Sequence, residues 1–412
     1  ALDQIRGNLE VPMPRTWVEL GVSTFGGMAR YFIDDVPRAY AEVEDAELQA
    51  NFTEAVDQAA MSLAELASWF EGLRDTATDD FALGPEMFSA MLRMTERVDI
   101  PLDELMALGQ ADLERNLALL AEACATFAPG TDHAGCFAAM DANKPRGGAV
   151  AGARAQLDRI KSFMLAENLA SIPAEDPIFV EEAPPYQRSN FAFIYTAGPY
   201  EQGMPSTYYI APPDPAWPEQ EQLDYVPGAA DLMSTSVHEV WPGHFLQFLH
   251  SNRAASPVGR LFVGYAFAEG WAHYTEDMMA DAGLSGGLAG GAAEFRVGQI
   301  KAALLRNVRF LCAIGLHTRD MSVAECERLF REQAYQDPGN ARQQAARGTY
   351  DPGYLKYTLG KLMIRKLRED WTASRGGREA WGEFHDTFLG HGGPPIPMLR
   401  QLMLGPDAGP AL

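Results

Sequence analysis

Apolar residues recur at three- and four-residue steps along most of the chain, which is the spacing of one face of an α-helix. The clearest example is residues 46–75, where the apolar stripe comprises Leu48, Phe52, Ala55, Ala59, Leu63, Leu66 and Phe70. The same pattern predicts further helices in residues 101–126, 148–170, 291–316, 322–335, 353–374 and 378–389. Pro101 and Pro352 stand where two of these helices would begin. The pattern therefore predicts a mainly α-helical protein.

Residues 188–215 depart from this helical pattern. The runs RSNFAFIYTAG and STYYIAPP are rich in aromatic and β-branched residues, and a Gly/Pro turn separates them. These features predict a small β-hairpin. An exposed edge such as Ser206–Ile210 could pair with an extended peptide by strand addition. A hairpin that only covers the core would fit the pattern nearly as well.

The length of the chain bounds its organisation. Its 412 residues exceed the roughly 250–300 at which single hydrophobic cores stop growing, so we expect one large body with two lobes. The Pro-rich stretch 173–187 is the best boundary. We expect a single catalytic domain over residues 1–412, with a helical N-terminal lobe in 1–185 and a motif-bearing lobe in 186–412.

Composition and charge exclude two function classes. The hydrophobic content of 47% is ordinary for a globular chain. No apolar run approaches the roughly 18 residues of a membrane span, so no transmembrane segment is expected. The net charge of −23, without any basic stripe, argues against a nucleic-acid partner. The acidity could steer cationic substrates, but a solvated acidic surface is the preferred interpretation.

The four cysteines fall into two local pairs, Cys124 with Cys136 and Cys312 with Cys326. Each pair flanks an expected loop between helices, a geometry that suits a disulfide. Two disulfides would indicate an oxidising compartment such as the periplasm, and we favour export over a cytoplasmic location. The alternative is four reduced, buried cysteines that act as small apolar residues.

The chemistry of the chain concentrates in the segment HEVWPGH at residues 238–244, which is followed 25 residues later by Glu269. Two histidines and a second acid can hold zinc and leave a position for water, whose proton the intervening Glu239 can take. The histidines are six residues apart, which turns them roughly 240° from each other on an unbroken helix. Pro242-Gly243 could break the helix and return His244 to His238. The spacing alone leaves open two histidines that bind no metal.

A wider resemblance supports the metal site. The HExxPGH core with Gln247 downstream, and then EGWAHYTE at 269–276, resembles the bacterial "domain of unknown function 885" family. Further matching segments are FALGPEMFSAMLRM, STYYIAPPDP, GLHTRDMSVAE, RGTYDPGYLKYTLGKLMIRKLRED and FHDTFLGHGGPPIPMLRQLML. That family in turn resembles the glutamate-ligand (gluzincin-like) zinc metallopeptidases. The resemblance implies a large two-lobed helical metallopeptidase-like fold with a small β-hairpin or sheet beside the active-site groove.

Carried onto this chain, the resemblance makes His238, His244 and Glu269 the ligands of one zinc ion per chain. It makes Glu239 the general base. Many relatives have a histidine directly after the PGH, where this chain has Phe245. That histidine is therefore absent here as an alternative ligand, and the difference could alter substrate preference.

Helical periodicity gives this motif a structural setting. HEVWPGH falls within an expected helical region of about 229–250, and Glu269 lies on the next expected helix, about 257–282. On that helix Glu269, His273 and Glu276 share one face. Glu269 is the preferred ligand, with Glu276 next in order. His273 and Glu276 could orient the metal ligands or form a polar seam without a role at the metal.

Amide hydrolysis also needs a donor to the oxyanion that forms when water adds to the carbonyl. In peptidases that the chain resembles, a tyrosine or histidine distant in the sequence does this. The candidates, in order, are Tyr357, Tyr354 and His317, each of which could instead be a packing residue. Arg347 and Tyr350 lie in the same segment. The remaining histidines, expected on the surface or in the core, are His133, His250, His385 and His391.

These observations predict a zinc-dependent hydrolase that cleaves amide bonds, most simply in a peptide substrate, with Glu239 as general base. One alternative is hydrolysis of a non-peptide amide or ester at the same metal centre. Another is a catalytically inactive binding protein on a peptidase scaffold, which the intact set of chemical residues disfavours.

Overall fold

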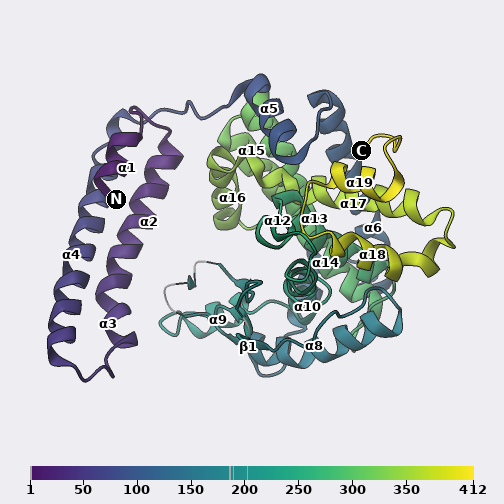
Figure 1. Cartoon of the computed structure of the whole chain (residues 1–412), viewed down its shortest axis with the longest axis horizontal. Helices are drawn as coiled ribbons and strands as arrows, with labels where there is room; N and C mark the ends of the chain where they lie inside the picture. Colours follow the sequence, from purple (N-terminus) through teal and green to yellow (C-terminus); the bar gives the residue numbers. More distant parts are fainter. Residues whose placement is uncertain (1, 185–186, 189, 202) are drawn as a thin grey trace.

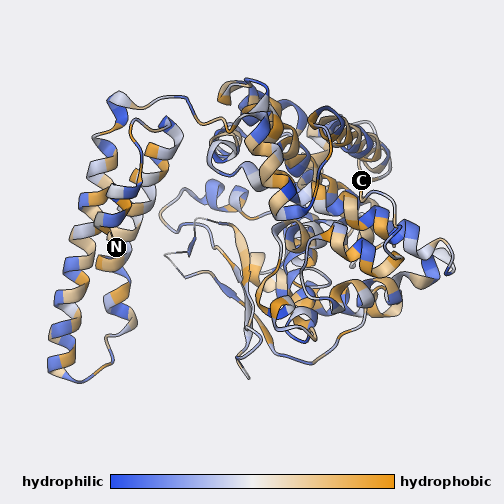
Figure 2. Ribbon diagram, turned by 45° about the horizontal axis from the view of Figure 1, so that its top comes forward, coloured by the Kyte–Doolittle hydropathy of each residue, from blue (hydrophilic) through white to orange (hydrophobic). Residues whose placement is uncertain are grey.

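The computed structural model describes residues 2–184, 187–188, 190–201 and 203–412. Helices form most of it, as the periodicity predicts (Figure 1). The N-terminal helices stand to one side of the remaining structure, and Figure 2 shows hydrophobic and hydrophilic positions interspersed along them. These elements are α1 (Leu2–Asn8), α2 (Arg15–Asp34), α3 (Val36–Ala39), α4 (Ala46–Glu71) and the 3-10 turn η1 (Arg74–Thr76).

The main body contains the other helices. They are α5 (Gly84–Glu96), α6 (Leu102–Phe127), α7 (His133–Ala142), α8 (Gly148–Ala166), α9 (Glu219–Tyr225), α10 (Ala229–Glu239), α11 (His244–Ser251), α12 (Pro257–Leu261), α13 (Tyr265–Asp281), α14 (Gly291–Thr318), α15 (Val323–Gln333), α16 (Pro338–Tyr350), η3 (Pro352–Leu355), α17 (Lys356–Thr372), η4 (Gly377–Ala380), α18 (Trp381–Gly390) and α19 (Ile396–Leu404). None of the described helices has the length and apolar character needed to cross a membrane.

Helix α14 is the centre of the main body. It packs against α6, α10, α13, α15, α16 and α17, and most of its residues are buried. The predicted helices in 101–126 and 291–316 correspond to α6 and α14 within two residues. Helix α2 was not predicted, since Gly21, Gly26 and Gly27 interrupt its apolar pattern.

The hydrophobic cores divide the chain near residue 80. One small core, formed by α1, α2 and α4, contains Val18, Leu66 and Phe70. The large core draws on residues from both sides of the predicted lobe boundary at 185, because α6 and α8 pack against elements of the C-terminal half. Helix α2 meets the body at α16, where the indole of Trp17 donates a hydrogen bond to the Thr349 carbonyl at 3.2 Å.

The predicted β-hairpin forms, as β2 (Ala192–Tyr195) and β3 (Ser206–Ile210) pair antiparallel. Strand β1 (Ile178–Glu182), which the sequence pattern did not predict, pairs parallel with the other side of β3. The strand order is β1-β3-β2, so Ser206–Ile210 is the central strand. The suggestion that it offers a free edge for peptide addition is therefore wrong, because both sides of its backbone are already paired.

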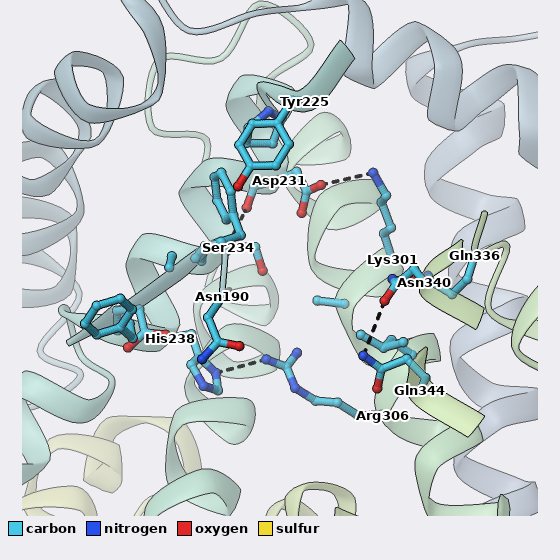
Figure 3. A pocket seen from close by; sticks show the side chains of 18 of the residues that line it. Asn190, Tyr225, Asp231, Ser234, His238, Lys301, Arg306, Gln336, Asn340 and Gln344 are labelled. Atoms are coloured by element: carbon cyan, nitrogen blue, oxygen red, sulfur yellow. Dashed lines mark hydrogen bonds and ion pairs between the residues drawn. The ribbon is translucent and has the colours of Figure 1, made fainter. Parts of the chain in front are cut away.

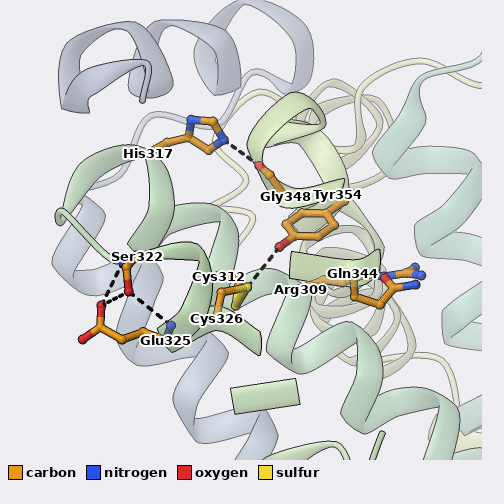
Figure 4. The surroundings of a disulfide bond; sticks show 9 residues. All are labelled: Arg309, Cys312, His317, Ser322, Glu325, Cys326, Gln344, Gly348 and Tyr354. Atoms are coloured by element: carbon orange, nitrogen blue, oxygen red, sulfur yellow. Dashed lines mark hydrogen bonds between the residues drawn. A yellow bond between two sulfur atoms is a disulfide. The ribbon is translucent and has the colours of Figure 1, made fainter. Parts of the chain in front are cut away.

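Both cysteine pairs are joined as disulfides. Cys124–Cys136 links α6 to α7, and Cys312–Cys326 links α14 to α15. Figure 4 shows the second bond beside Tyr354, whose hydroxyl lies 3.9 Å from the Cys326 sulfur. Each disulfide joins consecutive helices across a short connection, as the spacing predicts.

Candidate metal centre

The helix that carries HEVWPGH is broken at the Pro-Gly pair, as predicted. Helix α10 ends at Glu239, and α11 begins at His244. A Cβ on Gly243 would lie 1.8 Å from the His238 carbonyl oxygen, so only glycine permits this close return of the chain. The break brings the imidazole rings of His238 and His244 to 4.8 Å between centroids. The six-residue spacing is thereby compatible with one shared ion.

Glu269 is presented to the two histidines by α13, which begins at Tyr265, later than expected. Helix α13 contacts both α10 and α17. Its approach to α17 is close, because a Cβ on Gly270 would lie 2.5 Å from the Gly360 Cα. The glycines where α13 crosses α17 therefore let the two helices approach closely, which brings the N-terminal turn of α17 near Glu269.

The three predicted ligands converge. Glu269 Oε2 lies 3.4 Å from Nε2 of His238 and 3.4 Å from Nε2 of His244. The ligand atoms of all three residues lie within 4.8 Å of one another. In a tetrahedral zinc site, bonds of about 2.0–2.1 Å separate neighbouring ligand atoms by about 3.3–3.4 Å. In the described part of the chain, the buried Glu269 Oε2 has no hydrogen-bond partner. The donor set and its spacing fit zinc.

The electrostatics of the cluster also favour a cation. Burial and Arg306 alone would lower the pKa of His238, but the carboxylates of Glu269 and Glu276 raise it to about 9. Burial would raise the pKa of Glu269, but the two histidines hold it well below its usual range. The groups around these atoms therefore stabilise added positive charge.

Glu276 orients His238. The Nδ1 atom of His238 lies 2.6 Å from Glu276 Oε1, while Nε2 points to Glu269. Arg306 donates to the other Glu276 oxygen at 3.0 Å. A proton held on Nδ1 by a carboxylate leaves Nε2 free to bind metal. His273 is fully buried, and within the described residues neither of its ring nitrogens forms a hydrogen bond.

Glu239 is adjacent to the ligands and 9% exposed. It lines the same cavity as His238 and His244. Burial raises the pKa of the Glu239 carboxyl, although the neighbouring histidines oppose that effect. A carboxylate whose basicity is raised in this way is suited to accept a proton from water.

The cluster opens into a cavity of about 2060 Å³. Its walls come from α10, α14, α16 and the segment around β2. Figure 3 shows Arg306 of α14 reaching toward His238, and Lys301 of the same helix paired with Asp231. Aromatic residues on the sheet side include Phe191, Phe193 and Trp217. The cavity can hold a ligand of several residues beside the metal cluster.

The structure separates the three oxyanion candidates. Tyr357 lines the cavity. Burial raises the pKa of its hydroxyl, and the negative charge of Glu269 raises it further. Tyr354 is fully buried beside Cys326 and does not line the cavity. His317 does not line the cavity either, and its Nε2 lies 2.8 Å from the Gly348 carbonyl oxygen. Of the three, only Tyr357 lines the cavity.

The remaining residues named from the sequence divide into two groups. Arg347 and Tyr350 line the cavity, whereas the other histidines have hydrogen-bond partners or are exposed. Among the remaining histidines, His133 contacts the Tyr335 hydroxyl at 2.8 Å, His250 the Ser171 carbonyl at 3.1 Å and His385 the Tyr274 hydroxyl at 2.7 Å, and His391 is exposed.

One side of the cavity is basic, a feature that the sequence interpretation did not include. Lys301, Arg306 and Arg309 all lie on α14 and line the cavity. A signal was present, since these three cations interrupt a helix that is otherwise almost wholly apolar over its central turns. Charges in such a helix are rarely buried without a partner or a ligand.

Comparison with known proteins gives the family and the fold. The family described as "Bacterial protein of unknown function (DUF885)" matches residues 1–403. No curated protein matches the chain. A solved structure titled "putative lipoprotein of unknown function" from Shewanella oneidensis is 24% identical with a TM-score of 0.77, covering 98% of this chain and 75% of that one. A solved structure titled as a "putative lipoprotein" from Colwellia psychrerythraea is 18% identical with a TM-score of 0.77, covering 93% of this chain and 68% of that one. The chain therefore belongs to the DUF885 family of bacterial proteins of unknown function.

Proposed function

We propose that this protein is a zinc-dependent hydrolase that cleaves amide bonds in peptides. The observation that carries the proposal is the convergence of His238, His244 and Glu269, with the Glu269 oxygen 3.4 Å from both imidazole nitrogens. Glu239 lies directly beside these ligands, and a large cavity opens onto them. Two histidines, a glutamate ligand and an adjacent glutamate base are the groups that a zinc hydrolase requires, which supports the proposal.

The chain supplies three chemical roles. His238, His244 and Glu269 would hold the ion, and zinc in such a site lowers the pKa of water and polarises a carbonyl. Glu239 takes the proton of the attacking water and delivers it to the leaving amine. Tyr357 donates a hydrogen bond to the oxygen of the scissile carbonyl as negative charge develops on it.

An exported location belongs to the same proposal. Two disulfides in one chain are typical of oxidising compartments. The two similar structures are titled as putative lipoproteins, which is consistent with that setting.

The test is a turnover assay on zinc-loaded protein, with peptides of two to six residues and a parallel set of small N-acyl amides and esters. We expect cleavage of peptides, detected by mass spectrometry. Glu239→Gln should keep its zinc and lose about 10²–10⁴-fold in kcat/KM. Full activity in Glu239→Gln would exclude this mechanism. Cleavage of only the esters or small amides would replace the peptide substrate with that class.

A further inference from the structure

Arg309 is a buried cation that no acidic side chain neutralises. It lies on α14, is 8% exposed and lines the cavity. Its Nε donates to the Gln344 side-chain oxygen at 2.9 Å. Among the residues that the structure describes, no carboxylate forms an ion pair with its guanidinium. An uncompensated buried charge is costly unless a ligand supplies the opposite charge.

The neighbouring cations are different because each already has a carboxylate. Arg306 lies 3.0 Å from Glu276, and Arg347 lies 2.8 Å from Asp351. Lys301 is paired with both Asp141 and Asp231. Burial lowers the pKa of Arg309, and the charges of Arg347 and Arg306 lower it further. Within the described part of the chain, Lys144 and Arg188 also line the cavity without a carboxylate partner, but neither is buried. Among the described residues of the lining, Arg309 is therefore the buried cation that an anionic ligand could neutralise.

Arg309 is also close to the reaction site. Its guanidinium carbon lies 5.2 Å from the centre of the Tyr357 ring, and that of Arg306 lies 5.6 Å from the same ring. Tyr357 in turn interacts electrostatically with Glu269. A ligand group held by Arg309 therefore lies near the metal cluster.

We propose that Arg309 binds a carboxylate of the substrate and so directs cleavage to an amide bond close to that carboxylate. This inference rests on the proposed hydrolase function for its cleavage site, but carboxylate binding stands on Arg309 itself. A guanidinium matches a carboxylate through parallel N–H donors. The chemistry accommodates either a peptide C-terminus or an Asp or Glu side chain.

Binding is tested separately from turnover in a Glu239→Gln background. The probes are acetyl-Ala-Ala with a free C-terminus, acetyl-Ala-Ala-amide and acetyl-Ala-Glu-amide, with dissociation constants measured by calorimetry. We expect a probe with a carboxylate to bind about tenfold to a hundredfold more tightly than acetyl-Ala-Ala-amide. Preference for acetyl-Ala-Ala identifies the C-terminus, and preference for acetyl-Ala-Glu-amide identifies a side-chain carboxylate.

Adding Arg309→Met should abolish that preference and leave affinity for the amide probe unchanged. Arg309→Lys should restore part of it by keeping the charge. The matched control is Arg319→Met, an exposed arginine paired with Asp103 at the end of the same helix, which should change nothing. Zinc content and thermal unfolding verify that each variant is folded and loaded.

Equal affinity for all probes, including no binding of any, would overturn the inference, as would an equal loss for all probes in Arg309→Met. A carboxylate preference that depends on Arg309 in a protein that cleaves no peptide would support the anion site and count against the proposed hydrolase. The two proposals therefore fail in distinguishable ways.

Discussion

The two sides of the cavity bury charge in different ways. On α10 and α13, the histidines and carboxylates are arranged around one point and stabilise positive charge there. On α14, Arg306 is neutralised by Glu276, but Arg309 has no acidic partner among the described residues. In our proposals, one side of the cavity would bind a cation and the other an anion. A substrate that carries a carboxylate beside a metal-bound carbonyl would satisfy both.

A third set of buried charges provides a reference for this comparison. Lys361 of α17 lies 2.5 Å from Asp112 of α6, both side chains are almost inaccessible to solvent, and neither lines the cavity. Asn307 also donates to Asp112, at 2.8 Å. Here the charges compensate each other within the protein, which indicates a structural role, whereas charge at the cavity is left for ligands.

The largest effect on stability is expected when the ion pair between Asp112 and Lys361, the reference pair, is broken. Asp112→Asn leaves Lys361 buried without its counter-charge, which should destabilise the fold by about 3–5 kcal/mol in urea unfolding. The control is Asp103→Asn, an exposed carboxylate on the same helix, which should cost less than about 1 kcal/mol. Equal losses of stability in the two variants would contradict the distinction between charges that are paired within the protein and charges that are available to a ligand.

The oxyanion assignment gives the next effect. Tyr357→Phe should lower kcat by about 10²-fold while zinc content stays constant, because the hydroxyl acts mainly on the developing oxyanion. Tyr350→Phe, on the same cavity wall, should leave kcat near that of the wild type. An unchanged kcat in Tyr357→Phe would return the oxyanion role to another group.

Acid should weaken the reference pair in a defined range. Burial would raise the pKa of Asp112, but Lys361 and Asn307 lower it to about 2. The pKa of Asp112 in the folded protein lies below the unfolded value of about 3.9. The ionised carboxylate therefore stabilises the fold above pH 4, and this stabilisation is lost as the pH falls toward 2. The pKa difference corresponds to about 2 kcal/mol of folding stability. The stability gap between wild type and Asp112→Asn should narrow over this range, and a constant gap would contradict the assignment.

The smallest effect concerns the carboxylate shared by both sides of the cavity. Glu276→Gln weakens the hydrogen bond that orients His238 and removes the negative charge that pairs with Arg306. Zinc affinity, measured by competition with a chelator, should therefore fall about tenfold. Glu294→Gln, a buried carboxylate outside the cavity, is the control. Unchanged affinity in Glu276→Gln would make that carboxylate part of the fold rather than of the metal site.

The sequence predicted the site better than its surroundings, for local reasons. Pro242-Gly243 signals a helix break within seven residues, so the meeting of His238 and His244 follows from short-range rules. Glu269 needed the family resemblance, since only the tertiary crossing of α13 brings it to the histidines.

Long-range features were not predictable in the same way. Tyr354 and Tyr357 share an expected helical face, but the 3-10 turn before Lys356 changes their relative direction, and only Tyr357 reaches the cavity. Strand β1 lies in a Pro-rich stretch, and without it β3 resembles an edge. Arg309 is available to an anionic ligand only because the nearby carboxylates pair with other residues. Those pairings depend on the tertiary structure and cannot be predicted from a local sequence pattern.

The central claim is a zinc site at His238, His244 and Glu269, and metal content tests it most directly. Elemental analysis would be performed on protein purified without added metal or an affinity tag, beside the His244→Ala variant. We predict about one zinc per chain in the wild type and its loss in the variant. Absence of metal from both proteins, with no binding of added zinc, would contradict the account.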